Sequence, residues 1–120
     1  SLGFSALVVV GNKNGKVGYG LGKAKDISVA IQKAIKVARN GLVDVNISGF
    51  TIAHDVEAKF KSSRLKLMPA PEGSGIIAGG SVRHIVELVG IKNISAKLLG
   101  ASNNVCNAQC AIDALKKLKA

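Results

Sequence analysis

The chain opens with an apolar stretch whose residue types are typical of a β-strand. Residues 4–11 are rich in Val, and an Asn-Gly pair follows at residues 14 and 15. Asn-Gly readily adopts the positive φ angles that a tight hairpin turn requires. An extended pattern resumes at Lys16. Residues 4–20 are therefore predicted to form a β-hairpin.

The next segment has the periodicity of an amphipathic helix. Over residues 27–40 the apolar side chains recur three or four positions apart. Asp26 or Ser28 is suited to cap the first turn of this helix. The pair Asn40-Gly41 is suited to end it. A single helix is therefore predicted between these residues.

The remainder of the chain alternates between the two periodicities. Strands are predicted at residues 42–47, 52–58, 64–70 and 94–99, and helices at residues 82–89 and 104–119. A loop rich in Pro and Gly occupies residues 69–80, and such a loop is typical of a defined backbone shape. The predicted fold class is α+β, with one lobe over residues 1–60 and a second over residues 61–120.

The net charge of the chain indicates the class of partner that it binds. The chain has 17 Lys and Arg against 7 Asp and Glu, which gives a net charge of +10. A field of this sign attracts polyanions such as nucleic acids. Residues 1–70 hold 11 bases and 4 acids, and residues 71–120 hold 6 bases and 3 acids. The first half is therefore expected to make more of the phosphate contacts.

Other compositional features argue against membrane and secreted proteins. No apolar run approaches the roughly 18 residues that a membrane-spanning helix needs. Cys106 and Cys110 are four residues apart on one face of the last predicted helix, which indicates small apolar side chains rather than a disulfide framework. A reducing compartment fits this cysteine content. No secretory signal is visible, and the start inside a strand pattern suggests that a segment precedes it.

The densest chemical feature is a glycine-rich basic stretch over residues 15–25, with Lys13 just before it. Glycines expose backbone N–H groups and let a phosphate backbone come close, while the lysines supply charge. A nucleotide-binding P-loop is not supported, because Ala24 stands where a Mg²⁺-binding Ser or Thr is required and Val17 where the first Gly is required. A flexible hairpin with solvated lysines remains the alternative.

The glycine loop over residues 69–80 contains a pattern found in dinucleotide-binding proteins. Residues 73–78 satisfy the form G-x-G-x-x-A. About 20 residues further on, however, Ile94, Ser95 and Ala96 stand where a ribose-binding acid is required. A rigid loop in contact with a neighbouring backbone is the preferred interpretation.

The titratable side chains do not indicate catalysis. In an alternating strand His54 and Asp55 point to opposite faces, and no nucleophile pairs with them or with Glu57. His84 is interpreted as a surface or interface residue. Two Cys and two scattered His lack the spacing of a zinc site. The sequence therefore predicts no enzyme, no catalytic residue, no metal and no cofactor.

Asn103 and Asn104 precede the last predicted helix. The N-terminus of a helix can receive a phosphate. Asn is also an ordinary capping residue. Both interpretations stay open.

Two blocks of sequence resemble the small-subunit ribosomal protein S5 family. The first covers residues 4–25, through FSALVVVG and NGKVGYGLGKAK, and continues at residues 30–34. The second is PAPEGSGIIAGG at residues 69–80, followed in register by Arg83 and Glu87. The resemblance spans essentially the whole chain.

This resemblance implies an N-terminal lobe like a double-stranded-RNA-binding domain, with a sheet packed on one helix, and a C-terminal βαβα two-layer lobe. It implies binding to small-subunit rRNA and contact with ribosomal proteins S4 and S8. Members of the family support subunit assembly and translational accuracy near the point where mRNA enters, so mRNA is a further candidate partner. The expected location is the ribosome, in the bacterial cytoplasm or alternatively in a plastid or mitochondrion. A freestanding regulator that binds double-stranded RNA, and a small nucleotide enzyme, are the alternatives.

Two sets of site residues follow from the charge pattern and the resemblance. The residues expected to bind RNA are Lys13, Lys16, Lys23, Lys25, Lys61, Arg64, Asn103 and Asn104. The residues expected to form a protein interface are Glu72, Gly73, Ser74, Gly75, Gly79, Gly80 and Arg83. The family more often has Pro at the position of Asn104 and Arg at that of Gln109, and the missing Arg weakens the case for RNA contact by the last helix. A basic loop associated with spectinomycin sensitivity usually precedes the first strand in the family, and the chain starts after it.

Overall fold

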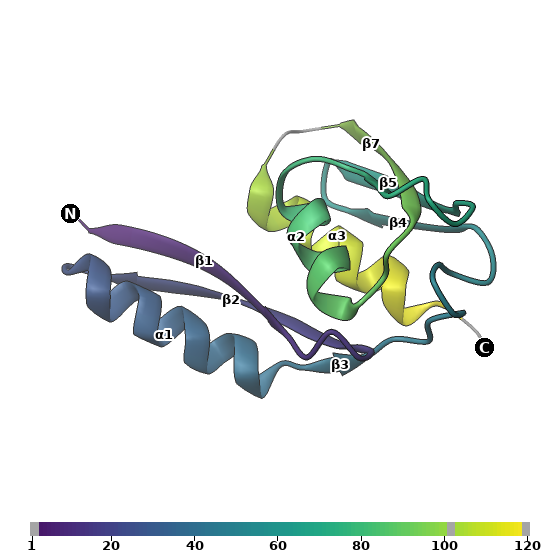
Figure 1. Ribbon diagram of the computed structural model, residues 1–120. Coiled ribbons are helices and arrows are strands. Elements are labelled where there is room, and N and C mark those ends of the chain that lie inside the picture. The colour runs from purple at the N-terminus through teal and green to yellow at the C-terminus, as the bar shows by residue number, and fades with distance from the viewer. Residues whose placement is uncertain (1–2, 101–102, 119–120) are drawn as a thin grey trace.

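The computed structural model describes residues 3–100 and 103–118, which form two sheets and three helices (Figure 1). The first sheet has the strand order β1-β2-β3, and the second has the order β4-β5-β7-β6. Helix α1 packs on the first sheet, and helices α2 and α3 contact strands of both sheets. The predicted α+β class is confirmed, with a sheet and one helix first and a sheet with two helices second.

The first lobe is a hairpin with a helix on one face. Strands β1 (Phe4–Gly11) and β2 (Lys16–Ala24) are antiparallel, and the short strand β3 (Val43–Asp44) pairs with the first residues of β2. Helix α1 (Ile27–Asn40) begins at the predicted cap, where the carboxylate of Asp26 accepts a hydrogen bond from the backbone N–H of Ser28 at 2.9 Å. The helix bounds agree with the prediction because they are set by local residues.

The second lobe has a sheet with one covered face. Its strands are β4 (Val56–Phe60), β5 (Ser63–Pro69), β6 (Ile76–Ile77) and β7 (Ile94–Gly100), and its helices are α2 (Gly80–Val89) and α3 (Asn104–Lys116). The side chains that point toward α2 and α3 are buried, among them Leu65, Leu67 and Ile94. Alternate side chains along the same strands point away from the helices.

A continuous hydrophobic core joins the two lobes. Val17 and Val45 of the first lobe belong to the same buried cluster as Val86 and Leu115 of the second. The tip of the β1–β2 hairpin also docks on the end of α2, where the backbone N–H of Lys13 donates to the carbonyl of Leu88 at 2.8 Å. The lobes are therefore packed together rather than connected by a free linker.

Several predicted boundaries differ from the structure. The strand expected at residues 42–47 is reduced to β3, and the one expected at residues 52–58 begins only at Val56. Strand β4, which the predicted division after residue 60 places in the first lobe, pairs with β5 in the second sheet. Strand β6 was not predicted. The last helix was expected to reach Lys119, which lies outside the described residues; it ends at Lys116. None of the described helices is both long and apolar enough to cross a membrane.

Candidate nucleic-acid interface

The glycines of strand β2 face helix α1 rather than solvent. Gly18, Gly20 and Gly22 are buried, and a Cβ atom at any of them would collide with backbone atoms of α1. The α1 residues below them are the buried alanines Ala30, Ala34 and Ala38. The expectation that these three glycines let a phosphate backbone come close is therefore wrong. Their absent side chains let a helix pack tightly on the sheet.

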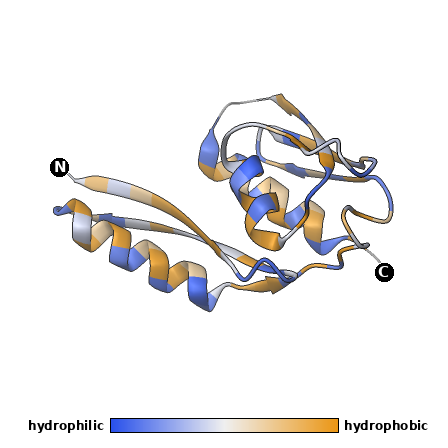
Figure 2. Ribbon diagram, in the orientation of Figure 1, coloured by the Kyte–Doolittle hydropathy of each residue, from blue (hydrophilic) through white to orange (hydrophobic). Residues whose placement is uncertain are grey.

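The four lysines of the hairpin lie at its two ends. Lys13 and Lys16 are at the tip, which is hydrophilic in Figure 2, while Lys23 and Lys25 lie beside the start of α1. Lys23 lies seven positions after Lys16 along β2, which corresponds to roughly 24 Å at about 3.4 Å per residue. The predicted hairpin site is therefore two cationic clusters on one rigid element.

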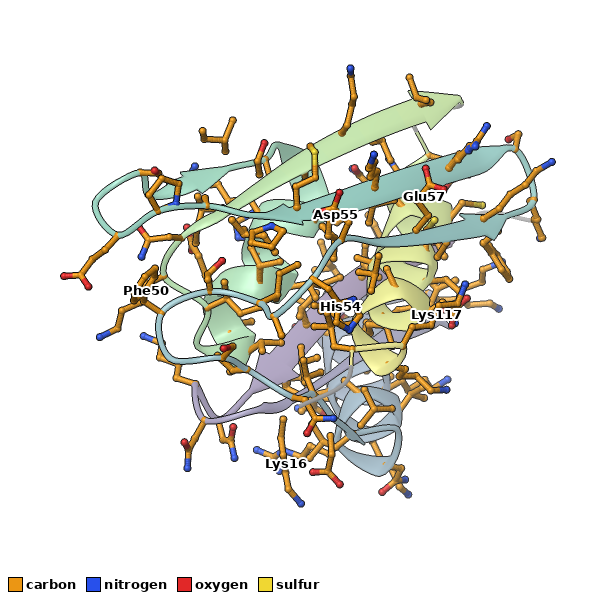
Figure 3. The ribbon with its side chains drawn as sticks, turned by 90° about the vertical axis from the view of Figure 1, so that its right-hand side faces the viewer. Lys16, Phe50, His54, Asp55, Glu57 and Lys117 are labelled. Atoms are coloured by element: carbon orange, nitrogen blue, oxygen red, sulfur yellow. The ribbon has the colours of Figure 1, made fainter. Side chains whose placement is uncertain are left out.

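All four of these lysines are exposed. Lys16 forms an ion pair with Asp44 at 3.6 Å, and its side chain points away from the core at the hairpin end (Figure 3). Both partners are more than half exposed, and such surface pairs contribute little free energy. At the other end, the Nζ atom of Lys33 on α1 donates to the carbonyl of Lys23 at 3.4 Å, so a third amine joins Lys23 and Lys25. Both clusters present amines that a phosphate can reach.

The other four predicted RNA-binding residues lie in the second lobe. Lys61 occupies the turn between β4 and β5 with a φ angle of 53°, and Arg64 lies on β5 with its guanidinium 3.9 Å from the carboxylate of Glu57. Asn103 caps α3 by accepting hydrogen bonds from two backbone N–H groups, and the carbonyl of Asn104 accepts one from Ser81. Capping is thus confirmed for Asn103. The structure places the eight predicted residues in several locations rather than in one site.

The glycine loop before α2 has a defined shape that depends on a buried side chain. The amide oxygen of Asn93 accepts hydrogen bonds from the backbone N–H groups of Gly73 and Gly75 at 3.1 and 2.9 Å, and Asn93 is only 5% exposed. Both glycines have positive φ angles, 93° and 74°, which explains the residue type. The dinucleotide-binding interpretation does not fit, because β6 follows these glycines and α2 begins only at Gly80.

The predicted protein-interface residues are arranged around this loop. Glu72, Ser74, Gly79 and Gly80 are exposed, as is Gly73. Arg83 is held in place, with Nε 3.0 Å from a carboxylate oxygen of Glu87 and one guanidinium N–H donating to the carbonyl of Ile76 at 2.9 Å. The loop and the start of α2 therefore form one firm, exposed surface. Sequence reasoning missed Asn93 as its anchor.

Two family models match the chain. Residues 1–46 match the N-terminal domain of ribosomal protein S5, and residues 58–120 match its C-terminal domain. The chain belongs to the ribosomal protein S5 family. The two matched ranges correspond to the two lobes, since the first ends after β3 and the second begins within β4.

Membership of the S5 family determines the general role of the chain. S5 proteins are structural, non-enzymatic ribosomal proteins of the small subunit, and they take part in translation as rRNA-binding components of a ribonucleoprotein. The chain therefore has a structural role in the ribosome. The resemblance found in the sequence is confirmed.

In this S5 family member, His54 and Asp55 make structural contacts. Asp55 lies 3.9 Å from the amine of Lys66, and the Nδ1 atom of His54 is 2.9 Å from the carbonyl of Asp55 (Figure 3). Within residues 3–100 and 103–118, no group of three or more His, Cys, Asp or Glu is placed to hold a metal ion.

Helix α3 is tied to the first lobe through Gln109. The hydroxyl of Tyr19 donates to the amide oxygen of Gln109, and the amide N–H of Gln109 donates to Asp113 at 2.7 Å. Burial, followed by the nearby carboxylate of Asp113, raises the pKa of Tyr19. Gln109 thus connects the two lobes.

Proposed function

We propose that the chain binds small-subunit rRNA through the hairpin and helix of its first lobe. Residues 1–46 contain seven bases and two acids, a net charge of +5, and this excess of cations is the observation that carries the proposal. The backbone positions that carry the exposed amines at both ends of the hairpin are fixed by strand pairing and by the packing of α1. Fixed cations are suited to neutralise phosphates at defined positions.

Membership of the S5 family also supports a proposal about specific partners and roles. The chain contacts ribosomal proteins S4 and S8, with the surface formed by the glycine loop and Arg83 toward a protein neighbour. It supports subunit assembly and translational accuracy near the point where mRNA enters, with mRNA as a further partner. It carries out no catalysis itself. A bacterial ribosome and a plastid or mitochondrial ribosome both suit the chain.

The experiment is a salt series of binding to transcribed small-subunit rRNA, measured by filter binding. Each lost phosphate contact lowers the slope of log affinity against log salt by about 0.9, so the double variant Lys23→Gln/Lys25→Gln should lower it by about 2. The double variant Lys92→Gln/Lys116→Gln loses the same charge from other exposed positions and should keep the slope. A wild-type affinity that hardly changes with salt would contradict the proposal.

An unrelated RNA duplex of equal length tests the alternative class of function. Domains that bind double-stranded RNA recognise its shape largely without regard to sequence. Equal affinity for the two RNAs would favour a freestanding double-stranded-RNA-binding protein. Preference for the small-subunit rRNA supports the ribosomal assignment.

A further inference from the structure

The second sheet has a face that no described element covers. Helices α2 and α3 pack on its inner side, and the opposite side of β4, β5 and β7 points away from the rest of the chain (Figure 1). We call this surface the outer sheet face. Because side chains alternate along a strand, its members are the residues between the buried ones. Its charged members are Glu57, Lys59, Arg64, Lys66 and Lys97, with Lys61 at the adjoining turn.

The strand register brings cations of this face directly opposite one another. Lys59 on β4 pairs with Arg64 on β5, and Lys66 on β5 pairs with Lys97 on β7. Neighbouring strands are about 4.8 Å apart, so these charges lie close together. Like charges directly opposite each other destabilise a sheet. Glu57 on β4 lies directly opposite Lys66 and offsets part of this repulsion. The two cation pairs are nevertheless unfavourable for folding alone, whereas an anion lying across the strands stabilises them.

The acids on and beside this face do not neutralise it. Arg64 lies 3.9 Å from Glu57 and Lys66 lies 3.9 Å from Asp55, and all four side chains are at least two-fifths exposed, so both ion pairs are weak. Within the described part of the chain, no ion pair reaches Lys59, Lys61 or Lys97. With five bases and two acids, the outer sheet face and its edge keep a net charge of +3.

The distribution of charge between the lobes points to the same surface. Division after residue 46 gives seven bases and two acids in the first lobe, and ten bases and five acids in the remainder. Both parts carry +5. The larger positive charge of residues 1–70 comes partly from residues 59–66, which the structure places in the second lobe. The second lobe therefore has as much net attraction for a polyanion as the first.

We propose that the outer sheet face binds a second segment of RNA through its backbone phosphates. The outward positions of β4, β5 and β7 that are not charged are Met68, Ser95 and Leu99, and none of them is aromatic. Because Phe60 alternates to the inner side, the face offers cations rather than aromatic rings on which bases would stack. Contacts to phosphates fix position without reading sequence. The surface therefore recognises a polyphosphate strand largely independently of its bases.

The two RNA surfaces point in different directions. In Figure 3, Lys16 at the hairpin tip lies at one end of the molecule and Glu57 on the outer sheet face lies toward the other. Figure 1 likewise places β4 and β5 on the far side of α2 and α3 from the hairpin. The chain thus bridges two RNA segments, with the two lobes fixed relative to each other by their shared core.

A bridging assay tests this proposal. One RNA duplex is immobilised, the protein is added, and retention of a second, labelled duplex is measured. The triple variant Lys59→Gln/Lys66→Gln/Lys97→Gln should lose bridging, and its salt slope for total RNA binding should fall by about 2 to 3. The control Lys92→Gln/Lys116→Gln/Lys117→Gln removes the same charge from exposed positions outside both surfaces and should still bridge. Unchanged bridging by the first variant would overturn the proposal.

A charge reversal separates binding from stability. Lys97→Glu places an acid opposite Lys66, so it should raise the melting temperature while it weakens RNA bridging. Weakened bridging together with a lower melting temperature would attribute the loss to unfolding and overturn the proposal. If the triple variant instead keeps its RNA affinity and loses association with other small-subunit proteins, the partner of this face is a protein and the proposal is wrong. The outer sheet face lies outside the first lobe. A negative result in the bridging assay therefore does not change the effect expected for Lys23→Gln/Lys25→Gln on the salt dependence of rRNA binding.

Discussion

Gly20 lies at the closest approach of strand β2 to helix α1. A Cβ atom there would collide with the backbone of Ala34 and Ala38, and backbone cannot move aside as a flexible side chain can. Gly20→Ala should lower the free energy of unfolding by about 3 kcal/mol through overpacking, measured by urea denaturation. Gly41→Ala is the control, because its added Cβ would make only ordinary contacts at 3.4 and 4.0 Å. A variant Gly20→Ala as stable as the control would contradict this account of the packing.

The role of these glycines was encoded in a pattern that can be read from sequence. Glycine at every second position of a strand leaves one face of that strand bare, and alanine at every fourth position of a helix gives a narrow stripe. Gly18, Gly20 and Gly22 match Ala30, Ala34 and Ala38 in this way. The adjacent lysines favoured a phosphate-binding interpretation, and the burial of the glycines shows that helix packing determines them.

Cys110 gives the stability of the protein a dependence on alkaline pH. Burial, followed by the carboxylate of Asp113, raises the pKa of its thiol above the ordinary value of 9.0, and the thiol contacts the carbonyl of Ala58. Because the pKa is higher in the folded state, its contribution to stability is complete below pH 9.0 and is lost as the pH rises further. Wild type should therefore lose more unfolding free energy than Cys110→Ala between about pH 8 and pH 10. Denaturation curves under reducing conditions measure the unfolding free energy at each pH. Parallel pH profiles of this free energy for wild type and Cys110→Ala would contradict the prediction.

At the scale of elements, Asn93 connects strand β7 with the glycine loop. Asn93→Ala removes the acceptor for the backbone N–H groups of Gly73 and Gly75 in a buried place. We expect a loss of about 2 kcal/mol in unfolding free energy and faster hydrogen exchange at both glycine amides. Asn103→Ala, which removes a helix cap, should cost about 1 kcal/mol and leave exchange at these amides unchanged. Protected amides in Asn93→Ala would show that the loop is held by other contacts.

The elements divide into those fixed by local residues and those fixed by distant ones. Helix α1 and its cap at Asp26 were predicted because a helix is specified by neighbouring side chains. Strand β6 has two residues and pairs with β7, so no local pattern of period two exists to indicate it. The register that sets Lys66 beside Lys97 likewise depends on pairing of strands far apart in sequence. For this reason the outer sheet face was not predicted, although Lys61 and Arg64 were identified individually.

At the scale of the whole molecule, the packing of the lobes determines how RNA is presented. The hairpin tip is hydrogen-bonded to the end of α2, and Tyr19 is bonded to Gln109 of α3. The glycine at the end of α2, Gly90, has a φ of 106° and lies against the backbone of Lys13, where a side chain would not fit. The relative orientation of the two cationic lobes is therefore set by close backbone contacts.

Net charge makes the free protein and the RNA complex respond to salt in opposite ways. The free chain carries +10, and its ion pairs are exposed, so salt screens more repulsion than attraction. Raising sodium chloride from about 50 to 200 mM should increase its melting temperature. In excess RNA, about six phosphate contacts would lose on the order of a thousandfold in affinity over this range, which removes about 4 kcal/mol of ligand-derived stability. Thermal melting with and without small-subunit rRNA should give slopes of opposite sign, and slopes of the same sign would mean that phosphate neutralisation does not dominate binding.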